Sequence, residues 1–517
     1  MTRSFRCISR DLPSKTNHYS TDEHESMAMG LRPFNFCGLI LLLVCCSNYL
    51  KADDRVSKEK KELCGIVNAR LAEDWDAALQ IWNFAEPGYQ ETKSSALLAS
   101  MLERAGFKIT KQVAGIPTAF TAEFSLGENP PIIGILGEFD ALPGLSQEAV
   151  PYRKVSEGKT YGHACGHHLF GVASASAAVS LSEYMTKHQL AGTIRFYGCP
   201  AEEGGSAKAF MVREGLFDDC GAVLHWHPSS MNAAGDRLSL ARIAVKFRFL
   251  GKAAHAAGAP EQGRSALDAV ELTNHAAQLL REHTPDGTRI HHIITAGGDA
   301  PNIVPRFAEV YYYVRHPESQ VVKDLYRRLE LCAQAGALAT ETILKIDYQG
   351  GIMEIFPNNT LASITMNNLK ALNDLTYSEE ELKFAIKLQE ELPQPEPLDS
   401  ISQVVDKSGT VGKGSTDVGD VSWVVPTTGF STACWVPGTP GHSWQAVACG
   451  GTTIARNGMN LATRVLATSA YDLLVDPDVI EQAQQEQAER LKDRKYETLL
   501  KQDQKPPLDY RNPPEQD

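Results

Sequence analysis

Apolar positions follow first a helical period and then a strand period in the first half of the chain. Between residues 58 and 106 they recur every three or four positions, as in helices that turn one face to a core. Nearly continuous apolar runs then predict buried strands at Thr118–Phe124, Pro131–Gly137 and Thr193–Gly198, with a small-residue helix at Gly171–Tyr184. This alternation predicts an α/β layered domain, in which functional groups gather at the carboxyl ends of the strands.

The pattern changes near residue 240, where polar and apolar residues begin to alternate one by one. Such alternation is typical of an antiparallel strand with one solvated face. The order from here is strand, helix, strand, strand, helix, strand, at Arg242–Leu250, Ser265–His283, Arg289–Ala296, Phe307–Arg315, Gln320–Thr340 and Ile343–Tyr348. That order is the ferredoxin-like arrangement, so residues 240–350 are predicted to form an inserted α+β domain.

These patterns divide the chain into ranges. A leader covers residues 1–55, the α/β domain covers 56–239 and 351–476, the inserted domain covers 240–350, and a polar tail covers 477–517. A chain of 517 residues is too long for one ordinary core, which agrees with two domains. The tail is rich in Gln, Lys, Glu and Pro, and we expect a helix there that frays into an unstructured end.

The leader contains one apolar run, Leu39–Cys46, preceded by Arg32. The run is too short to span a bilayer, which takes roughly 20 residues, and it fits the apolar core of a signal peptide cleaved between Ser47 and Ala52. We therefore expect secretory routing. The alternatives are a retained membrane anchor at the N-terminus and a cytoplasmic protein with an uninterpretable leader.

Composition excludes some partners and fixes little else. Apolar residues make up 43% of the chain and charged residues 22%, as in soluble globular proteins. The net charge of −13 argues against a nucleic-acid partner, which would need a basic surface. The cysteines after the leader are widely spread and show no disulfide framework.

Candidate metal ligands lie close together in two places. Cys165 and His167 flank one glycine, and Glu202 and Glu203 are adjacent and follow a predicted strand. Thiolate and imidazole suit Zn²⁺, and carboxylates also suit Mn²⁺ or Co²⁺. On extended backbone the two glutamates would point to opposite sides, so that one ligates metal and the other faces the substrate. The alternative is a packed cysteine, a capping histidine and solvated glutamates.

Further histidines and one aspartate fit the same site. His227 precedes a proline at a predicted strand end, which favours it over His225, and His442 lies beside a turn. Asp140 follows a buried strand and either caps a turn or orients a ligating imidazole. His255 is a lone histidine in the insert, and such a residue is usually an ordinary surface side chain.

Longer motifs then identify a resemblance. They are Gly137–Leu145, His163–His167, Phe196–Gly205, Gly263–Val270 and Ser415–Trp423. With them the chain resembles, from about Arg70 to Leu474, the M20 metallopeptidases, and in particular the amidohydrolase branch that includes aminobenzoyl-glutamate hydrolases and related dipeptidases. The resemblance implies a zinc-peptidase-like α/β/α catalytic domain with the insert as lid and dimerisation domain.

The resemblance also assigns roles to residues. It implies a centre of two divalent metal ions, zinc or manganese, held by Cys165, His167, Glu203, His227 and His442. Glu202 would be the general base, and Asp140 would support the catalytic centre. His255 would reach the active site of the partner subunit, and Asn302 and Arg315 would hold the substrate carboxylate.

The implied reaction is hydrolysis of an amide bond next to a free carboxylate in a small acyl-amino acid or dipeptide. Substrates of the aminobenzoyl-glutamate and β-alanyl dipeptide types both fit, and the dimer is a homodimer or includes a related subunit. Two other hypotheses remain: a catalytically silent dimerisation partner, and a thiol hydrolase using Cys165 with His163 or His167. His168 departs from the family, which usually carries Asp or Asn there.

Overall fold

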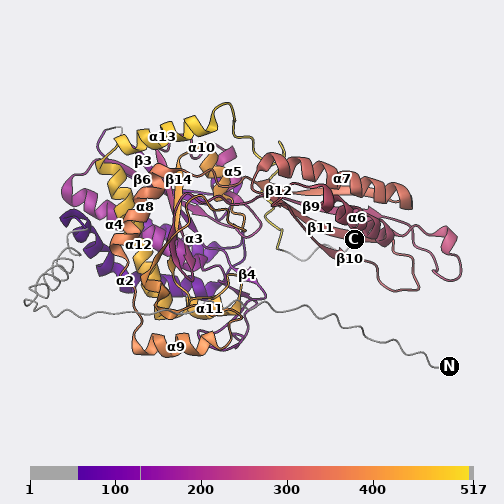
Figure 1. Ribbon diagram of the computed structural model, residues 1–517, viewed down its shortest axis with the longest axis horizontal. Helices are drawn as coiled ribbons and strands as arrows, with labels where there is room; N and C mark the ends of the chain where they lie inside the picture. The colour runs from indigo at the N-terminus through magenta and orange to yellow at the C-terminus, as the bar shows by residue number, and fades with distance from the viewer. Residues whose placement is uncertain (1–55, 129, 512–517) are drawn as a thin grey trace, which may run out of the picture. The chain divides into compact units, whose positions relative to one another are not determined.

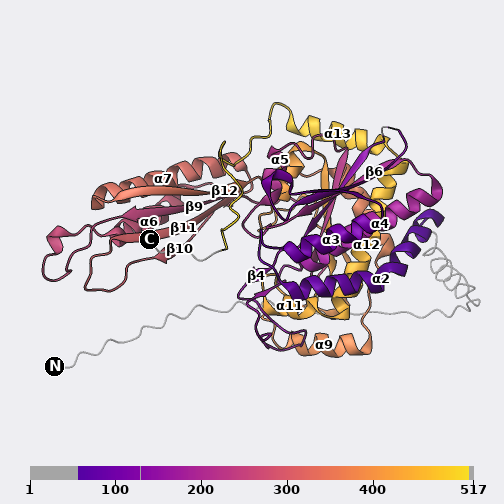
Figure 2. The same ribbon diagram turned by 180° about the vertical axis from the view of Figure 1, so that it is seen from behind.

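The computed structural model describes residues 56–128 and 130–511 (Figures 1 and 2). The predicted leader and its signal sequence lie outside these residues. Within them no helix combines the length and apolar character needed to cross a membrane. The described chain builds one large mixed sheet, one smaller antiparallel sheet and a short two-stranded ribbon of β4 (Leu142–Pro143) and β5 (Tyr161–Gly162).

The large sheet has eight strands in the order β1-β2-β6-β3-β7-β14-β8-β13. Their bounds are β1 Lys108–Lys111, β2 Phe120–Leu126, β6 Gly192–Cys199, β3 Ile132–Glu138, β7 Ala222–Ser229, β14 Thr427–Ala433, β8 Asn232–Ala234 and β13 Val404–Asp406. The four central strands, β6, β3, β7 and β14, run parallel. Their carboxyl ends therefore open at one edge, where an α/β sheet places its site.

Helices flank this sheet on both faces. Their bounds are α2 Lys58–Phe84, α3 Thr92–Arg104, α4 His167–His188, α5 Ala207–Arg213, α8 Asn359–Leu372, α9 Glu379–Gln389, α10 Val418–Val424, α11 Trp444–Gly450, α12 Thr453–Val475 and α13 Asp478–Leu491. Helices α2, α4 and α12 pack against one another (Figure 2). The small residues of α4 are buried along almost its whole length, which lets it lie close to β3.

The two faces of β3 have different neighbours. A Cβ atom at Gly137 would lie 3.4 Å from the Cα atom of Gly171, so this side of β3 faces α4. Side chains alternate along a strand, so Glu138 points to the opposite face, where Lys208 of α5 meets it. The prediction of a layered α/β domain is confirmed.

The smaller sheet has the order β10-β11-β9-β12 and is antiparallel throughout. Its elements are β9 Ala241–Leu250, α6 Ala266–Leu280, β10 Arg289–Ala296, β11 Phe307–His316, α7 Ser319–Thr340 and β12 Ile343–Ile352. The chain order β-α-β-β-α-β is the predicted one, and α6 and α7 pack together over the sheet (Figure 1). The ferredoxin-like insert is confirmed, and we call it the lid.

The end of the described chain differs from the predicted fraying tail. After α13, residues 492–511 bury Leu499 and Leu500 and return to the catalytic domain. Tyr496 and Tyr510 pack against the main core as well. These apolar anchors are irregularly spaced among polar residues, so no periodicity in the sequence signals them. We call residues 492–511 the C-terminal segment.

Candidate metal centre

His167 is the first residue of α4 and is fully buried at the edge where β3 ends. Its Nδ1 atom lies 2.8 Å from Oδ1 of Asp140, so the imidazole donates its proton to that carboxylate. The opposite atom, Nε2, has no hydrogen-bond partner, although Oε2 of Glu138 lies 3.1 Å away. A carboxylate that fixes one nitrogen and leaves the other free is the usual support of a metal-binding histidine.

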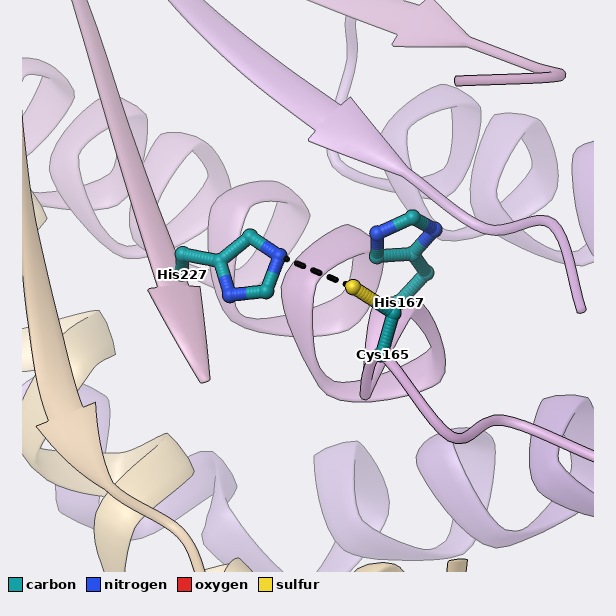
Figure 3. A group of neighbouring side chains, drawn as sticks. All are labelled: Cys165, His167 and His227. Carbon is teal, nitrogen blue, oxygen red and sulfur yellow. Dashed lines mark hydrogen bonds between the residues drawn. The ribbon is translucent and has the colours of Figure 1, made fainter. Parts of the chain in front are cut away.

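Cys165 and His227 face His167 (Figure 3). The Sγ atom of Cys165 lies 3.3 Å from Nε2 of His227, whose Nδ1 donates to the carbonyl of Pro228 at 2.7 Å. The ligand atoms of these three residues all lie within 4.8 Å of one another. Gly166, with φ +75°, makes this possible, because a Cβ atom there would lie 2.8 Å from Cβ of Pro228.

A second group shares Cys165 with the first. Cys165, Glu203 and His442 also place their ligand atoms within 4.8 Å of one another. Oε1 of Glu203 lies 2.8 Å from Nε2 of His442, whose backbone N–H donates to the carbonyl of Ala164 at 2.9 Å. Thiolate, imidazole and carboxylate donors grouped in this way fit divalent metal ions of the zinc type.

Burial raises the pKa of the Cys165 thiol well above its ordinary value. A neutral thiol is a poor nucleophile, whereas a bound cation would stabilise the thiolate. The burial therefore favours metal ligation over the thiol-hydrolase hypothesis.

Glu202 and Glu203 do not lie on extended backbone as expected. Strand β6 ends at Cys199, and residues 202–205 form a turn that begins after Ala201, whose φ is +53°. The turn still separates the two carboxylates. Glu203 lies in the group with Cys165, whereas Glu202 lies in a third group with Glu138 and His167. Burial, Glu138 and Glu203 raise the pKa of Glu202 well above its usual range, so this carboxyl group holds a proton readily.

Asp140 is buried and serves two neighbours. One oxygen holds His167, and the other accepts the backbone N–H of Glu203 at 3.0 Å. His167 and these hydrogen bonds keep the pKa of Asp140 below its ordinary value in spite of burial, which raises it. Asp140 therefore fixes the relative position of two candidate ligands.

Two residues near the site, Glu138 and Lys208, were not among the predicted ones, whereas Asp417 was expected either to orient a ligand or to form a turn. Lys208 is fully buried, with its Nζ atom 2.7 Å from Glu138 and 2.6 Å from Asp417. Glu138 precedes Asp140 by two positions at the end of β3. Because residues two apart on a strand face the same side, this spacing could have predicted that Glu138 lies near the site. A lone lysine in a short helix gives no such signal, because only the fold brings it to two carboxylates.

Two predicted residues lie elsewhere. His255 and Asn302 are exposed in neighbouring loops of the lid, where the backbone N–H of Ala256 donates to the carbonyl of Asn302 at 3.0 Å. Neither residue lines the cavity of its own subunit. Nδ1 of His255 accepts the backbone N–H of Gly258 at 3.0 Å, so its exposed Nε2 carries the proton.

His168 also lies outside the metal groups. Its ring is buried beside His163 at 4.9 Å between centroids, and Nε2 donates to the carbonyl of Gly450 at 3.0 Å. Burial and His163 lower its pKa well below the ordinary value, so the ring is neutral. In this structure His168 is a hydrogen-bonded core residue.

Four of the five candidate ligands line one cavity of about 750 Å³, and the fifth, His167, is fully buried and does not line it. The catalytic domain contributes Glu138, Cys165, Glu202, Glu203, His227 and His442; the lid contributes Arg242, Tyr311, Tyr313 and Arg315; and the C-terminal segment contributes Tyr510 and Arg511. Clustered metal ligands at the carboxyl edge of a layered sheet, covered by an inserted α+β domain, define a metal-dependent hydrolase of the two-domain type.

Comparisons with known proteins agree. The model of the peptidase dimerisation domain of the M20 family matches residues 241–341. The chain is 40% identical over 440 residues to a subunit of the p-aminobenzoyl-glutamate hydrolase of Escherichia coli (strain K12), and the match covers 80% of this chain and 91% of that protein. It is 29% identical over 442 residues to the Xaa-Arg dipeptidase of Mus musculus, covering 81% of this chain and 92% of that protein.

Among solved structures, a dinuclear metal binding peptidase of the M20 family from Bacillus subtilis is similar with a TM-score of 0.54 and 17% identity. The similarity covers 79% of this chain and 99% of that one, and it concerns the fold. The chain belongs to the M20 family of metallopeptidases and amidohydrolases. It is thus a metal-dependent amide hydrolase that carries a dimerisation domain.

Proposed function

We propose that the protein hydrolyses the amide bond of an N-acyl-glutamate, with p-aminobenzoyl-glutamate as the first compound to test. The proposal rests on the positively charged arginine side chains that line the cavity wall. Arg242 and Arg315 line it, and within the described chain their guanidinium groups contact Ser206 and Tyr313 rather than an acid. Guanidinium groups bind carboxylates in a bidentate manner, and a glutamate product has two of them.

Both arginines lie against one aromatic ring, that of Tyr313. The guanidinium groups of Arg242 and Arg315 lie 4.8 and 5.5 Å from the ring centre of Tyr313, and Nη2 of Arg242 donates to Oγ of Ser206 at 3.0 Å. Nε of Arg315 is buried without a hydrogen-bond partner. Such a wall favours an acidic substrate and disfavours a cationic side chain of the kind that an Xaa-Arg dipeptide would bring.

Within the chain, the proposed ligands of two metal ions are Cys165, His167, Glu203, His227 and His442. When bound, two divalent ions would polarise the scissile carbonyl and make a water molecule acidic enough to react. Glu202 takes the proton of that water and delivers it to the leaving amine. Glu138 and Glu202 both line the cavity and lie outside both cysteine-containing groups, and Glu138 is paired with Lys208. We propose zinc or manganese as the metal.

We also propose a homodimer formed through the lid. Strand β10 is an edge strand whose Ile293 and Ile294 are 62% and 47% exposed, and α6 exposes Leu272 and Leu279. Edge pairing and burial of these side chains would join two copies. His255 of the partner subunit then donates its Nε2 proton to the developing oxyanion. The alternative is a hetero-oligomer with a related chain, because the similar hydrolase of Escherichia coli is named for more than one kind of subunit.

For localisation we propose secretory routing from the leader, with cleavage between Ser47 and Ala52. N-terminal sequencing of the protein recovered from the medium of expressing cells tests this proposal. Recovery only inside the cells, with the leader intact, would contradict it.

The test of function is hydrolysis of a substrate panel by metal-free protein reconstituted with Zn²⁺ or Mn²⁺. The panel contains p-aminobenzoyl-glutamate, N-benzoylglycine, a β-alanyl dipeptide and an Xaa-Arg dipeptide. We expect kcat/KM to be highest for the glutamate compound and activity to disappear with a chelator. A preference for the Xaa-Arg dipeptide, or activity indifferent to the chelator, would overturn the proposal.

A further inference from the structure

The C-terminal segment is attached to both domains before it reaches the cavity. On the lid side, the hydroxyl of Tyr348 donates to the carbonyl of Leu499 at 2.6 Å, and Nε2 of Gln504 donates to the carbonyl of Gln349 at 3.0 Å. Leu499 also packs with Ile243 and Met353 in a small core between the domains. The segment therefore follows the base of the lid.

On the catalytic side, the hydroxyl of Tyr496 donates to Oδ1 of Asp420 at 2.8 Å. Nη1 of Arg213 in α5 donates to the carbonyl of Gln504 at 2.6 Å. Contacts on both sides of the same segment fix its path, so its last described residues are delivered to a defined place.

That place is the backbone of a proposed metal ligand. The hydroxyl of Tyr510 donates to the carbonyl of Glu203 at 3.0 Å, and Nη2 of Arg511 donates to the same carbonyl. The ring of Tyr510 packs edge-on against Tyr89 at 5.7 Å and fills the space beside Gly88, where a Cβ atom would lie 2.2 Å from its hydroxyl. Tyr510 and Arg511 thus both donate to one carbonyl oxygen and hold the end of the C-terminal segment against the turn at residues 202–205.

Arg511 keeps unused hydrogen-bonding capacity there. It lines the cavity, and its Nε is buried without a partner. Among the residues described, no carboxylate lies within ion-pair distance of its guanidinium group, which lies 4.7 Å from the ring centre of Tyr510. A guanidinium group at the wall of a substrate cavity without a direct ion pair is suited to an acid brought by the ligand.

We propose that Arg511 is a specificity-determining residue that binds the side-chain carboxylate of the glutamate part of the substrate, and that Tyr510 is the positioning residue that holds it. This inference rests on the proposed function, since it names the second carboxylate of the same substrate. Arg315 lines the same cavity from the lid and serves the other carboxylate. The C-terminal segment thereby contributes to the active site of its own subunit.

The test compares two substrates that differ in one charge, p-aminobenzoyl-glutamate and p-aminobenzoyl-glutamine, for the full-length dimer and Arg511→Ala. We expect KM for the glutamate compound to rise about 10- to 100-fold, the range for a lost hydrogen bond to a charged group. KM for the glutamine compound and kcat for both should change less than about threefold. Tyr510→Phe should raise KM for the glutamate compound by a smaller factor.

Lys505→Ala is the matched control, because Lys505 is an exposed cation of the same segment without a hydrogen bond or ion pair in the described chain. It should leave both substrates unaffected. An equal loss for both substrates in Arg511→Ala would indicate a merely structural role, and no loss would remove Arg511 from the site. Either result overturns the inference.

The role of Arg511 can be tested separately from the proposed function. If the wild-type protein hydrolyses neither compound, calorimetry with glutarate still tests Arg511. Binding of glutarate that weakens at least tenfold in Arg511→Ala supports a carboxylate site there. Equal affinity for the variant and the wild type overturns it.

Discussion

Lys208 is a buried cation between two buried carboxylates. Although burial lowers its pKa, Asp417 and Glu138 hold that pKa well above the ordinary value. The backbone N–H of Lys208 also donates to Asp417 at 2.9 Å. Removing one partner from such a cluster leaves uncompensated charge in a medium of low dielectric constant. Lys208 therefore stabilises the buried side of the site through Glu138 and Asp417.

We predict that Lys208→Met lowers the free energy of unfolding by about 3–5 kcal/mol. Urea unfolding of the metal-free protein measures the change, and Lys383→Met on the exposed face of α9 is the control. A loss for Lys208→Met no larger than for the control would contradict the prediction.

Glu202 and Glu203 are neighbours with different expected roles. Glu202→Gln should leave the metal content of the purified protein unchanged and lower kcat by about 10²- to 10⁴-fold, because it removes the proton acceptor. Glu203→Gln is the comparison variant and should lose bound metal. Metal analysis together with steady-state kinetics checks both. Full activity of Glu202→Gln would exclude the residue as the base.

Much of the site could be predicted from residue types and spacing. Cys165, His167 and Glu203 lie in short motifs, and the fold needs only to bring two motifs to neighbouring strand ends. Lys208 and Arg511 could not be predicted, because their partners are distant in sequence and neither lies in a chemical motif. His168 was an open question that only packing against Gly450 answers.

At the scale of elements, strands and helices of the lid follow the hydrophobic pattern closely, since one face of each packs on a single small core. The start of α4 is less predictable. The expected helix began at Gly171, whereas α4 begins at His167 because Gly166 turns the chain into it. The C-terminal segment was missed since it has no regular period, and its burial depends on Leu499 and Leu500 meeting the lid base.

The contact between α10 and the C-terminal segment is sensitive to pH. Burial raises the pKa of Asp420 from 3.8 to about 7, against hydrogen bonds from Tyr496 and the backbone of Met353 that lower it. Between these values the folded protein holds a proton that the unfolded chain has released. The stability due to the neutral group is therefore fully present below pH 3.8 and is lost as the pH rises to about 7.

We predict that Asp420→Asn removes this part of the pH dependence. Between pH 4.5 and pH 7 the free energy of unfolding of the wild-type protein should fall with pH more steeply than that of the variant, by up to about 1.4 kcal/mol per pH unit. Urea unfolding across this range measures it, with Asp76→Asn on the exposed face of α2 as control. Parallel profiles for Asp420→Asn and the wild type would contradict the prediction.

At the scale of the whole molecule, the site is proposed to need two subunits. His255 lies away from the cavity of its own chain, whereas Glu202 lies in it. We predict that Glu202→Ala and His255→Ala, each nearly inactive alone, regain activity when mixed and allowed to exchange subunits. One site of the mixed dimer then has an intact base and the intact His255 of the partner subunit, so about a quarter of wild-type activity is expected by simple random pairing.

The mixing experiment has a built-in control. Two preparations of Glu202→Ala, mixed in the same way, should remain inactive. If His255 acted within its own chain, no mixed dimer would contain a complete site and the mixture would also stay inactive. Native mass spectrometry of the mixture establishes that subunits have exchanged.

Strands β9 and β12, which begin and end the lid, pair with each other, with Arg242 opposite Ile352. The chain therefore leaves the catalytic domain and re-enters it at almost the same point. The lid is inserted into the catalytic domain at a position that a short loop could bridge. Strands β7 and β14 pair although a long stretch of chain separates Ser229 from Thr427. Once the lid has folded, that stretch is effectively shorter by the length of the lid, so pairing the two strands costs less conformational entropy. The lid can therefore change its cavity-lining residues and its exposed surface while the candidate metal ligands of the catalytic domain stay in place.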